Sequence, residues 1–311
     1  MSLYLLSGGA GFIGTNFAIN FLKNDKHKSD TLLIIDKFSY CSNNLVKTIK
    51  DKRLIVIKED LLNYEEINKI FNKYKIDYII NMASLTHVDY SIVSPLDTYK
   101  NNTLLTLNLL ELGLKHKVKR FHQVSTDEVY GSTSLDSSYR YKESDALNPT
   151  NPYSASKASQ DLLVLSYHKT YGMDVTISRC SNNYGKYQYE EKFIPKAIKS
   201  AKNNEAIKIY GEGKNVRDWI DVNEHVRAID FIIDSGKSGE IYNVSTHNEY
   251  NNLKVAKMIL DILNKDESLL SFTIDRLGHD LRYALDTTKI EELGFKFKNE
   301  DFYDGLVKLC K

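Results

Sequence analysis

Residues 3–14 read LYLLSGGAGFIG, and the amphipathic run Asn16–Leu22 follows them at once. The apolar residues at the front are typical of a short buried strand, and the run behind them is typical of a helix. A glycine loop between a strand and a helix is the context in which proteins bind the pyrophosphate of a dinucleotide. Gly8 and Gly11 would allow a tight turn and a close approach of backbone N–H groups, and Gly14 would let the helix pack closely on the strand. A glycine turn without function is the alternative, but the position at the first strand–helix junction favours a dinucleotide site.

An acidic residue stands at the end of the second predicted strand. Thr31–Ile35 is apolar and ends in Asp36, about 20 residues after the glycines, where a ribose-binding carboxylate is expected. A carboxylate there accepts hydrogen bonds from the ribose hydroxyls and repels a 2′-phosphate, so Asp36 favours NAD over NADP. Lys37 beside it argues mildly for the opposite preference, and a solvated acid at a strand end is the alternative interpretation of Asp36.

Strand and helix patterns alternate along the first part of the chain. Further strands are predicted at 54–57, 77–82, 119–125 and 174–179, and helices at 64–74, 95–116 and 153–171. This order predicts an α/β fold with a doubly wound parallel (Rossmann) sheet. Beyond it the alternation loosens into helices at 193–203 and 222–235, a strand at 240–244 and polar loops at 182–185, 210–213 and 275–280. We expect an NAD-binding domain that carries the catalytic residues over 1–180, and a smaller C-terminal substrate-binding lobe over 181–311, interleaved with the end of the sheet.

Composition limits the classes of function. The 311 residues carry a formal net charge of +1, so no overall field favours nucleic acid or an anionic membrane. No apolar run approaches the roughly 20 residues that a membrane-spanning helix needs, and no leader segment is recognisable before the first strand. The three cysteines show neither metal-ligand nor disulfide spacing. We expect a cytoplasmic protein without a metal ion that binds neither nucleic acid nor membranes.

Two stretches hold side chains that can move protons. Residues 125–131, STDEVYG, follow an apolar run and place a hydroxyl and two carboxylates where that strand should end. Residues 151–157, NPYSASK, contain a Tyr-x-x-x-Lys pair, whose side chains lie one turn apart on the same face of a helix. Gathered over a bound dinucleotide, these groups could move several protons and a hydride. The candidate catalytic residues are Thr126, Asp127, Glu128, Tyr153 and Lys157.

With these residues in hand, the chain resembles the extended short-chain dehydrogenase/reductases that act on nucleotide sugars, and more narrowly the dTDP-glucose 4,6-dehydratase family. The glycine loop and the Tyr-x-x-x-Lys pair are shared by epimerases, decarboxylases and reductases of this group, whereas Thr126-Asp127-Glu128 is the part specific to the dehydratases. The resemblance runs from Leu3 to at least Phe295. It includes four further motifs: NNYG at 182–185, EKFIP at 191–195, RDWI at 217–220 and DRLGHD at 275–280.

The resemblance and the loop positions together imply which residues bind the two ligands. The residues expected to bind NAD lie in the glycine loop, at the ends of the following strands and in the Tyr-x-x-x-Lys pair: Gly8, Gly11, Phe12, Ile13, Gly14, Asp36, Lys37, Ser39, Asp60, Leu61, Ala83, Ser84, Tyr153 and Lys157. Those expected to bind the nucleotide sugar lie in the loop after 77–82 and in or near the further motifs: Thr86, Asn183, Lys192, Phe193, Lys208, Tyr210, Arg217, Asn252, Arg276 and His279.

The resemblance also implies how these residues divide the work. Arg217 and Arg276 would neutralise phosphate oxygens with their fixed donor forks. Asn183 and Asn252 would hydrogen-bond the diphosphate or the sugar. Lys192 and Phe193 would line the base. For Thr86, an ordinary loop hydroxyl is the alternative to a substrate contact.

The implied reaction is NAD-dependent dehydration of a nucleotide-activated glucose to the 4-keto-6-deoxy sugar. Tyr153 would accept the proton of the 4-hydroxyl, with Thr126 bonded to the same oxygen, while hydride leaves C4 for NAD. Glu128 would then remove the C5 proton and Asp127 would protonate the departing 6-hydroxyl, before hydride returns to C6. The Lys157 ammonium and the positive nicotinamide ring would both favour the Tyr153 phenolate.

Some positions depart from the family pattern and leave alternatives open. Leu85-Thr86, Lys186 and Leu277 stand where the bacterial dTDP enzymes usually carry other residues, so dTDP-glucose is the first expectation and UDP-glucose the second. A 4-epimerase or a decarboxylase is the nearest alternative, and a non-catalytic NAD-binding module is a more distant one. The family usually forms homodimers through paired helices, which implies a homodimer through 95–116 and 153–171.

Overall fold

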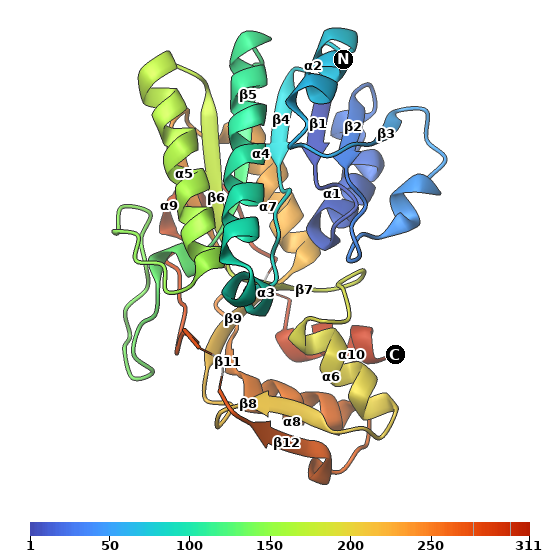
Figure 1. Cartoon of the computed structure of the whole chain (residues 1–311). Helices are drawn as coiled ribbons and strands as arrows, with labels where there is room; N and C mark the ends of the chain where they lie inside the picture. The colour runs from blue at the N-terminus through green and yellow to red at the C-terminus, as the bar shows by residue number, and fades with distance from the viewer. Residues whose placement is uncertain (276, 299) are drawn as a thin grey trace.

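The computed structural model describes residues 1–275, 277–298 and 300–311. A seven-stranded parallel sheet with the strand order β10-β6-β5-β4-β1-β2-β3 forms its centre (Figure 1). In chain order its strands are β1 (Leu3–Ser7), β2 (Thr31–Asp36), β3 (Leu54–Lys58), β4 (Tyr78–Asn81), β5 (Arg120–Thr126), β6 (Val175–Cys180) and β10 (Glu240–Val244). The chain fills one half of the sheet from β1 to β3 and the other half from β4 onward, so the sheet is doubly wound. The predicted fold class is confirmed.

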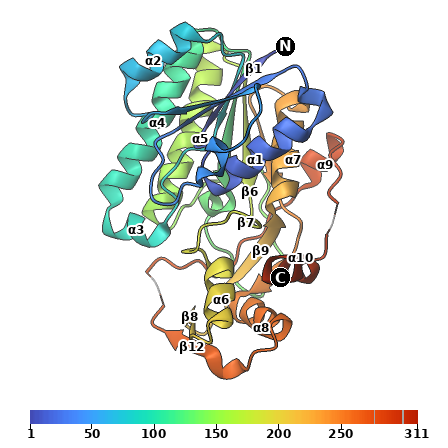
Figure 2. The same cartoon turned by 90° about the vertical axis from the view of Figure 1, so that its right-hand side faces the viewer.

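Helices cover both faces of this sheet (Figure 2). They are α1 (Phe12–Lys23), α2 (Tyr64–Lys73), α4 (Pro95–Lys115), α5 (Pro152–Tyr171) and α7 (Val222–Ser235). α1 and α7 bury side chains such as Phe17 and Val226 against one face. α2, α4 and α5 bury others, such as Leu109 and Val164, against the opposite face. Strands buried on both faces must be apolar throughout, which explains why β2 reads TLLIID.

A smaller lobe lies beyond the carboxyl ends of the central strands (Figure 1). It contains a three-stranded sheet of order β11-β9-β7 and a two-stranded sheet of β12 and β8, and its core includes Tyr184, Trp219 and Phe302. The remaining elements of the chain are α3 (Val88–Val93), β7 (Asn182–Tyr184), α6 (Phe193–Lys202), β8 (Ile207–Tyr210), β9 (Val216–Asp221), β11 (Glu249–Asn251), α8 (Asn252–Ile262), β12 (Leu270–Thr273), α9 (Thr288–Glu292) and α10 (Phe302–Cys310), with 3₁₀ helices at Asp25–His27, Asn44–Lys47, Asp127–Tyr130 and Glu267–Leu269.

The sequence predicted the central sheet better than the lobe. Each strand and helix expected in the first 180 residues is present, with shifted ends. The prediction of a polar loop at 182–185 was wrong, because Asn182–Tyr184 is β7, and the loop predicted at 210–213 begins on the last residue of β8. The sequence also missed β8, β9, β11, β12 and the helices α3, α8, α9 and α10. These strands mix polar with apolar residues, as in IKIY, VRDWID, EYN and LSFT, so no continuous apolar run marks them.

Within the described ranges of the chain, every helix is too short or too polar to cross a membrane.

His122 is fully buried inside the sheet. It lies on β5, with its ring nitrogens 2.9 Å from Thr176 Oγ1 and 3.1 Å from Ser178 Oγ on β6. Burial, aided by the charges of His225 and Arg120, lowers the pKa of His122 from 6.5 to about 3. Between these two pH values the unfolded chain therefore binds a proton that the folded chain does not bind. The neutral His122 ring therefore contributes to the free energy of unfolding above pH 6.5, and this contribution is lost as the pH falls toward 3.

We expect His122→Gln to remove this part of the pH dependence. Between about pH 7 and about pH 5.5, the wild type should lose about 1 kcal/mol more unfolding free energy than the variant, whatever their difference at neutral pH. Urea unfolding at both pH values, followed by the fluorescence of the single tryptophan, measures both losses. Equal losses would contradict the assignment of His122 as a buried neutral group.

Candidate functional site

The glycine loop between β1 and α1 leaves no room for side chains. Gly8 has a φ of +67°, and a Cβ there would lie 2.8 Å from Ala83 Cα, while a Cβ on Gly14 would lie 2.5 Å from Gly8 O. Gly11 is the N-cap of α1, whose first turn has no side-chain cap and no acidic residue. The N–H groups at this helix end, including those of Phe12 and Ile13, therefore suit a phosphate ligand. The loop fits a bound dinucleotide.

We expect Gly14→Ala to reduce cofactor binding strongly. The added methyl group would meet backbone atoms of Gly8 and Gly9 rather than a movable side chain, so the loop would have to shift away from the phosphates. Overpacking of this kind costs about 1–3 kcal/mol, so the NAD content of the purified protein should fall about tenfold or more. Gly113→Ala in α4 is the control, because its methyl group would mainly meet the ends of flexible side chains. A Gly14 variant with wild-type NAD content would contradict the role of this loop.

Asp36 is buried at the end of β2 and faces the glycine loop. Its carboxylate accepts hydrogen bonds from Ala10 N–H at 3.0 Å, from Phe38 N–H at 2.7 Å and from the Ser42 hydroxyl at 3.3 Å. A carboxylate has about four acceptor positions. These bonds therefore hold Asp36 in place and leave acceptor capacity for a ribose.

Other residues predicted for the cofactor lie at the carboxyl ends of β2 and β3. Lys37 Nζ donates to Asn101 Oδ1 at 2.8 Å and lies 3.8 Å from Asp60 Oδ2. Ser39 Oγ lies 3.5 Å from Cys41 Sγ, and Leu61 is buried. Because Lys37 already bonds an amide and lies near a carboxylate, its ammonium charge is partly neutralised. Lys37 is therefore a weaker partner for a 2′-phosphate.

Ala83 and Ser84 follow β4, beside the glycine loop. Ser7 Oγ accepts from Ala83 N–H at 3.1 Å and donates to Asn81 Oδ1 at 2.6 Å, and the Ser84 hydroxyl donates to Leu85 O at 3.5 Å. The hydrogen bond between Ser7 and Ala83 ties the loop after β4 to the end of β1. At this point the direction of winding of the sheet reverses. Ligands of open α/β sheets bind at such a point.

A buried polar network that the sequence analysis missed joins this point to α5. Asn81 Nδ2 donates to Thr106 Oγ1 at 3.0 Å and to Gln123 Oε1 at 2.8 Å, and Gln160 Nε2 donates to Thr106 Oγ1 at 2.6 Å. All four residues are fully buried. The polar residues at the buried positions of strands such as YIIN were the signal that could have revealed it.

Thr126, Asp127 and Glu128 form the junction between β5 and the 3₁₀ helix Asp127–Tyr130. Thr126 Oγ1 donates to Asp127 Oδ1 at 3.1 Å and accepts from Glu128 N–H at 3.3 Å. Asp127 is only 2 % exposed, and its Oδ2 has no hydrogen-bond partner among the described residues. Burial, and then the charge of Glu128, raise the pKa of Asp127 well above its ordinary value. Burial and the neighbouring charge therefore both favour the protonated form of Asp127.

Tyr153 and Lys157 lie on the first turns of α5. Asn151 caps this helix in a capping box with Ser154, which fixes the start of the helix next to the end of β5. Lys157 Nζ donates to Val124 O at 2.7 Å. Both Tyr153 and Lys157 are buried, and burial lowers the pKa of Lys157 to about 8.

The surroundings of Tyr153 oppose its ionisation more than the sequence suggested. Burial, and then the charges of Glu128, Cys180 and Asp127, raise its pKa well above 10. The ammonium of Lys157 is directed to a main-chain oxygen. Lys157 is not among the described groups that shift the pKa of Tyr153. Cys180 was not predicted; it is buried at the end of β6 and its thiol lies 3.4 Å from Ser125 O.

Arg217 is a buried cation with no acidic partner among the residues that the structure describes. Its NH1 donates to Val216 O at 2.8 Å and its NH2 to Asp280 O at 3.0 Å, and its guanidinium lies 4.5 Å from the centre of the Tyr283 ring. It forms no ion pair with any described carboxylate. The charge of Arg217 partly offsets the increase in the pKa of Asp127 and of Tyr283, so the guanidinium lies near both groups. An unpaired buried guanidinium suits an anionic ligand.

Asp280 and Tyr283, which the sequence analysis did not select as ligand contacts, join Arg217 to the start of α5. Asp280 Oδ2 accepts from Thr150 Oγ1 at 2.7 Å and from the Tyr283 hydroxyl. Glu128 is among the groups that raise the pKa of Tyr283, after burial. Asp280 is the last residue of the DRLGHD motif, and its place in that motif could have identified it from the sequence.

The other predicted substrate residues are only partly gathered together. Lys192 Nζ donates to the main-chain oxygen of Thr86 at 2.9 Å. The rings of Tyr210 and His279 lie 6.0 Å apart, and Lys208 is exposed on the same strand as Tyr210.

The two predicted amide ligands, Asn183 and Asn252, have different surroundings. Asn183 donates to Ser181 O at 3.0 Å, and its Oδ1 lies 2.9 Å from His225 Nδ1, so structural bonds occupy its side chain. Asn252 is the first residue of α8, and the Phe193 ring lies 6.5 Å from the Trp219 ring. Arg276 lies outside the described residues.

Among the described residues, no group of three or more His, Cys, Asp or Glu residues could hold a metal ion.

Comparisons with known proteins agree with this geometry. The family model described as GDP-mannose 4,6 dehydratase matches residues 5–307. The dTDP-glucose 4,6-dehydratase of Mycobacterium tuberculosis is 38 % identical over 303 residues, which cover 97 % of this chain and 90 % of the relative. The crystal structure of DesIV, a dTDP-glucose 4,6-dehydratase from Streptomyces venezuelae with NAD bound, has a TM-score of 0.94 at 38 % identity and covers 99 % of this chain and 95 % of that chain. That of the Bacillus anthracis dTDP-glucose 4,6-dehydratase in complex with NAD has a TM-score of 0.91 at 36 % identity and covers 100 % and 96 %. The chain therefore belongs to the dTDP-glucose 4,6-dehydratase family.

Proposed function

We propose that this protein is an NAD-dependent hydro-lyase that converts dTDP-glucose to the 4-keto-6-deoxy sugar. The observation that carries the proposal is the Asp127 carboxyl, which is buried, has a raised pKa and keeps one oxygen without a partner among the described residues, next to Glu128 in the chain. A reaction that only oxidises and re-reduces C4 needs no such acid/base pair, so a 4-epimerase is the weaker interpretation. Membership of the family supports the same conclusion.

Residues 1–180 would hold the cofactor and most of the reacting groups, and residues 181–311 would mainly hold the nucleotide. Gly8, Gly11 and Gly14 would receive the pyrophosphate of NAD, and Asp36 would bind its ribose. Bound NAD supplies a hydride acceptor that takes the C4 hydride of the sugar and returns it to C6. Three dispersed free cysteines suit a reducing, cytoplasmic setting.

Oxidation at C4 would depend on Tyr153, Lys157 and Thr126. Tyr153 would accept the 4-hydroxyl proton, and Thr126 would turn its hydroxyl from Asp127 to the same sugar oxygen. Because burial and nearby acids oppose the Tyr153 phenolate, oxidation would wait until the positively charged cofactor is in place. This order would prevent the chemistry from starting in a cofactor-free site.

Elimination of water would depend on the two acids. Glu128 would remove the C5 proton, which the C4 ketone makes acidic. Asp127 would give its proton to the 6-hydroxyl as this group leaves. Their unequal burial supports this division of roles, since Asp127 is 2 % exposed whereas Glu128 is only partly buried. Arg217 would bind the diphosphate that carries the sugar and so hold C5 and C6 against this pair.

A side-by-side incubation with dTDP-glucose and UDP-glucose tests the proposal. We expect loss of water from dTDP-glucose, measured as a mass change, and slower or no loss from UDP-glucose. Loss from UDP-glucose alone would overturn the choice of nucleotide. Loss from neither, in protein that still contains NAD, would overturn the dehydratase itself.

We further propose a homodimer through α4 and α5. These helices lie side by side, with Tyr99 OH 2.9 Å from Ser159 Oγ, and they expose apolar side chains, among them Leu104 and Leu162, which is 59 % exposed. Clustered exposed apolar side chains are typical of a protein–protein interface.

We expect Leu162→Arg to halve the molar mass in solution, because a buried unpaired charge would oppose the pairing of the helices. Light scattering after size-exclusion chromatography measures the change. Leu135→Arg, at an exposed loop position, is the control. A wild-type protein that is already monomeric would contradict the proposal.

A further inference from the structure

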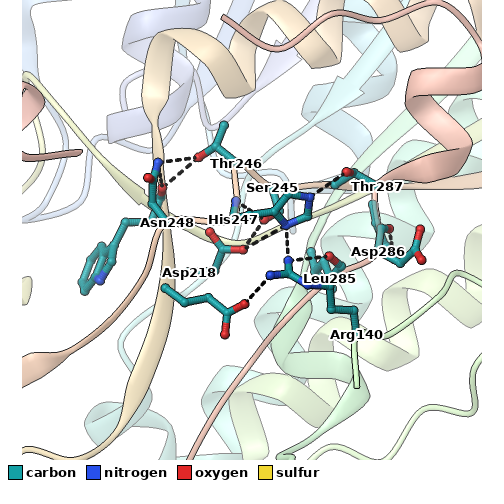
Figure 3. Close-up of polar contacts among 12 residues, drawn as sticks. Arg140, Asp218, Ser245, Thr246, His247, Asn248, Leu285, Asp286 and Thr287 are labelled. Carbon is teal, nitrogen blue, oxygen red and sulfur yellow. Dashed lines mark hydrogen bonds and ion pairs between the residues drawn. The ribbon is translucent and has the colours of Figure 1, made fainter. Parts of the chain in front are cut away.

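A polar cluster that includes Asp218, Ser245 and His247 has no part in the reaction described so far (Figure 3). Asp218 follows Arg217 on β9, and because side chains alternate along a strand it points to the opposite face. Its carboxylate is fully buried and accepts a hydrogen bond from the hydroxyl of Ser245, the residue that follows β10. One oxygen, Oδ1, has no partner among the described side chains. Asp218 thus joins the strand of Arg217 to the end of the central sheet.

The same serine stabilises a strained turn. Ser245 Oγ also accepts from His247 N–H at 3.2 Å, and His247 has a φ of +59°. A residue other than glycine adopts this conformation at a cost unless its surroundings fix it. The turn leads into β11, whose Glu249 pairs with Asp218 in register. Ser245 therefore fixes both the strand of Arg217 and the strand that borders it.

The His247 ring extends the cluster to two more segments. Its Nδ1 contacts the Arg140 guanidinium, which can only donate, so Nδ1 must be the unprotonated nitrogen. Nε2 then carries the hydrogen and donates to Thr287 Oγ1 at 3.1 Å. Arg140 also donates to Glu249 at 2.7 Å. Arg140 belongs to the connection between the catalytic acids and α5, and Thr287 to the segment that begins at Asp280.

We infer that Asp218 and Ser245 are positioning residues for Arg217: by joining β9 to the end of β10 they set where the diphosphate is held relative to Asp127 and Glu128. The inference rests on the proposed function, because it takes the ligand of Arg217 to be that diphosphate. Both residues are fully buried, and Asp218 lies on the face of β9 opposite Arg217. Among the described residues, Arg217 hydrogen-bonds to main-chain oxygens and contacts the Tyr283 ring, so its position depends on the position of β9.

A double-mutant cycle tests this inference on the NAD-containing protein. Ser245→Ala should weaken dTDP binding about tenfold, because hydrogen bonds to charged groups are the strong ones and their loss is felt at Arg217. The KM for dTDP-glucose should rise more than kcat falls. In an Arg217→Met background, the same Ser245→Ala change should cause almost no further loss, since its effect passes through the missing guanidinium.

Ser178→Ala is the matched control. It removes an equally buried serine hydroxyl, here bonded to His122 at 3.1 Å, and should leave dTDP affinity unchanged. If Ser245→Ala lowers the NAD content or the folded yield, Asp218→Asn takes its place in the cycle, because it keeps the size of the side chain and removes its charge.

The outcomes separate the inference from the proposed function. If the losses of dTDP affinity add in the double variant, or if Ser245→Ala leaves that affinity unchanged, the positioning role is overturned. Either result would leave the proposed dehydration of dTDP-glucose standing. A wild-type holoenzyme that does not bind dTDP in calorimetry would instead overturn the proposed substrate.

Discussion

Asp127→Asn is expected to slow dehydration of dTDP-glucose about 10³-fold, because general acid catalysis contributes about 10²–10⁴-fold and an amide cannot donate a proton to a leaving hydroxyl. Burial and the charge of Glu128 raise the pKa of the wild-type carboxyl and so favour the form that can donate. Oxidation at C4 does not need this group. The variant should therefore accumulate 4-keto-glucose nucleotide and reduced cofactor, seen by mass and by near-ultraviolet absorbance.

The pH dependence gives a second readout of the same group. Only the protonated carboxyl of Asp127 is active, so the elimination rate of the wild type should fall as the pH rises through the raised pKa of Asp127. In Asp127→Asn this alkaline decline should disappear. Asp136→Asn, at an exposed acid in a loop, should behave as the wild type. Wild-type dehydration by the Asp127 variant would refute the assignment of the general acid.

Tyr153→Phe is expected to prevent the first step and so to reduce all product formation by about 10³-fold or more. No other described hydroxyl is proposed to take the C4 proton, and Thr126 can only share a hydrogen bond. Rapid mixing with dTDP-glucose should produce no absorbance of reduced cofactor, which distinguishes this variant from Asp127→Asn. Tyr242→Phe also removes a hydroxyl from a buried ring, one that accepts from Lys237 N–H at 2.9 Å, and it should leave oxidation intact.

The cofactor should decide how easily Tyr153 loses its proton. In the cofactor-free site the pKa of Tyr153 is raised by burial and by Glu128, Cys180 and Asp127. Removal of the charge of Glu128 by Glu128→Gln should therefore make the oxidation step less dependent on high pH, even though elimination is blocked. An oxidation step that becomes slower and more alkaline in this variant would contradict the account.

Features that depend on neighbours in the chain were predictable from the sequence. The glycine loop, the acid at the end of β2 and the Tyr-x-x-x-Lys pair each lie within a few residues of the strand or helix that positions them. The alternation of apolar strands and amphipathic helices sufficed to predict the doubly wound sheet, because each parallel strand needs a crossover before the next. The strands of the lobe mix polar with apolar residues, so no such pattern marks them.

The sequence by itself thus determined the family, the fold class and the identity of the five catalytic candidates. Only the tertiary structure decided that Asp127 is buried with a raised pKa, that burial and nearby acids raise the pKa of Tyr153, and that Arg217 is a buried cation with no acidic partner among the described residues. It alone joined Asp218 to Ser245 across 27 positions of the chain. The physical reason is that pKa values and buried contacts are set by the sum of all groups within a few ångströms, and most of those groups come from distant parts of the sequence.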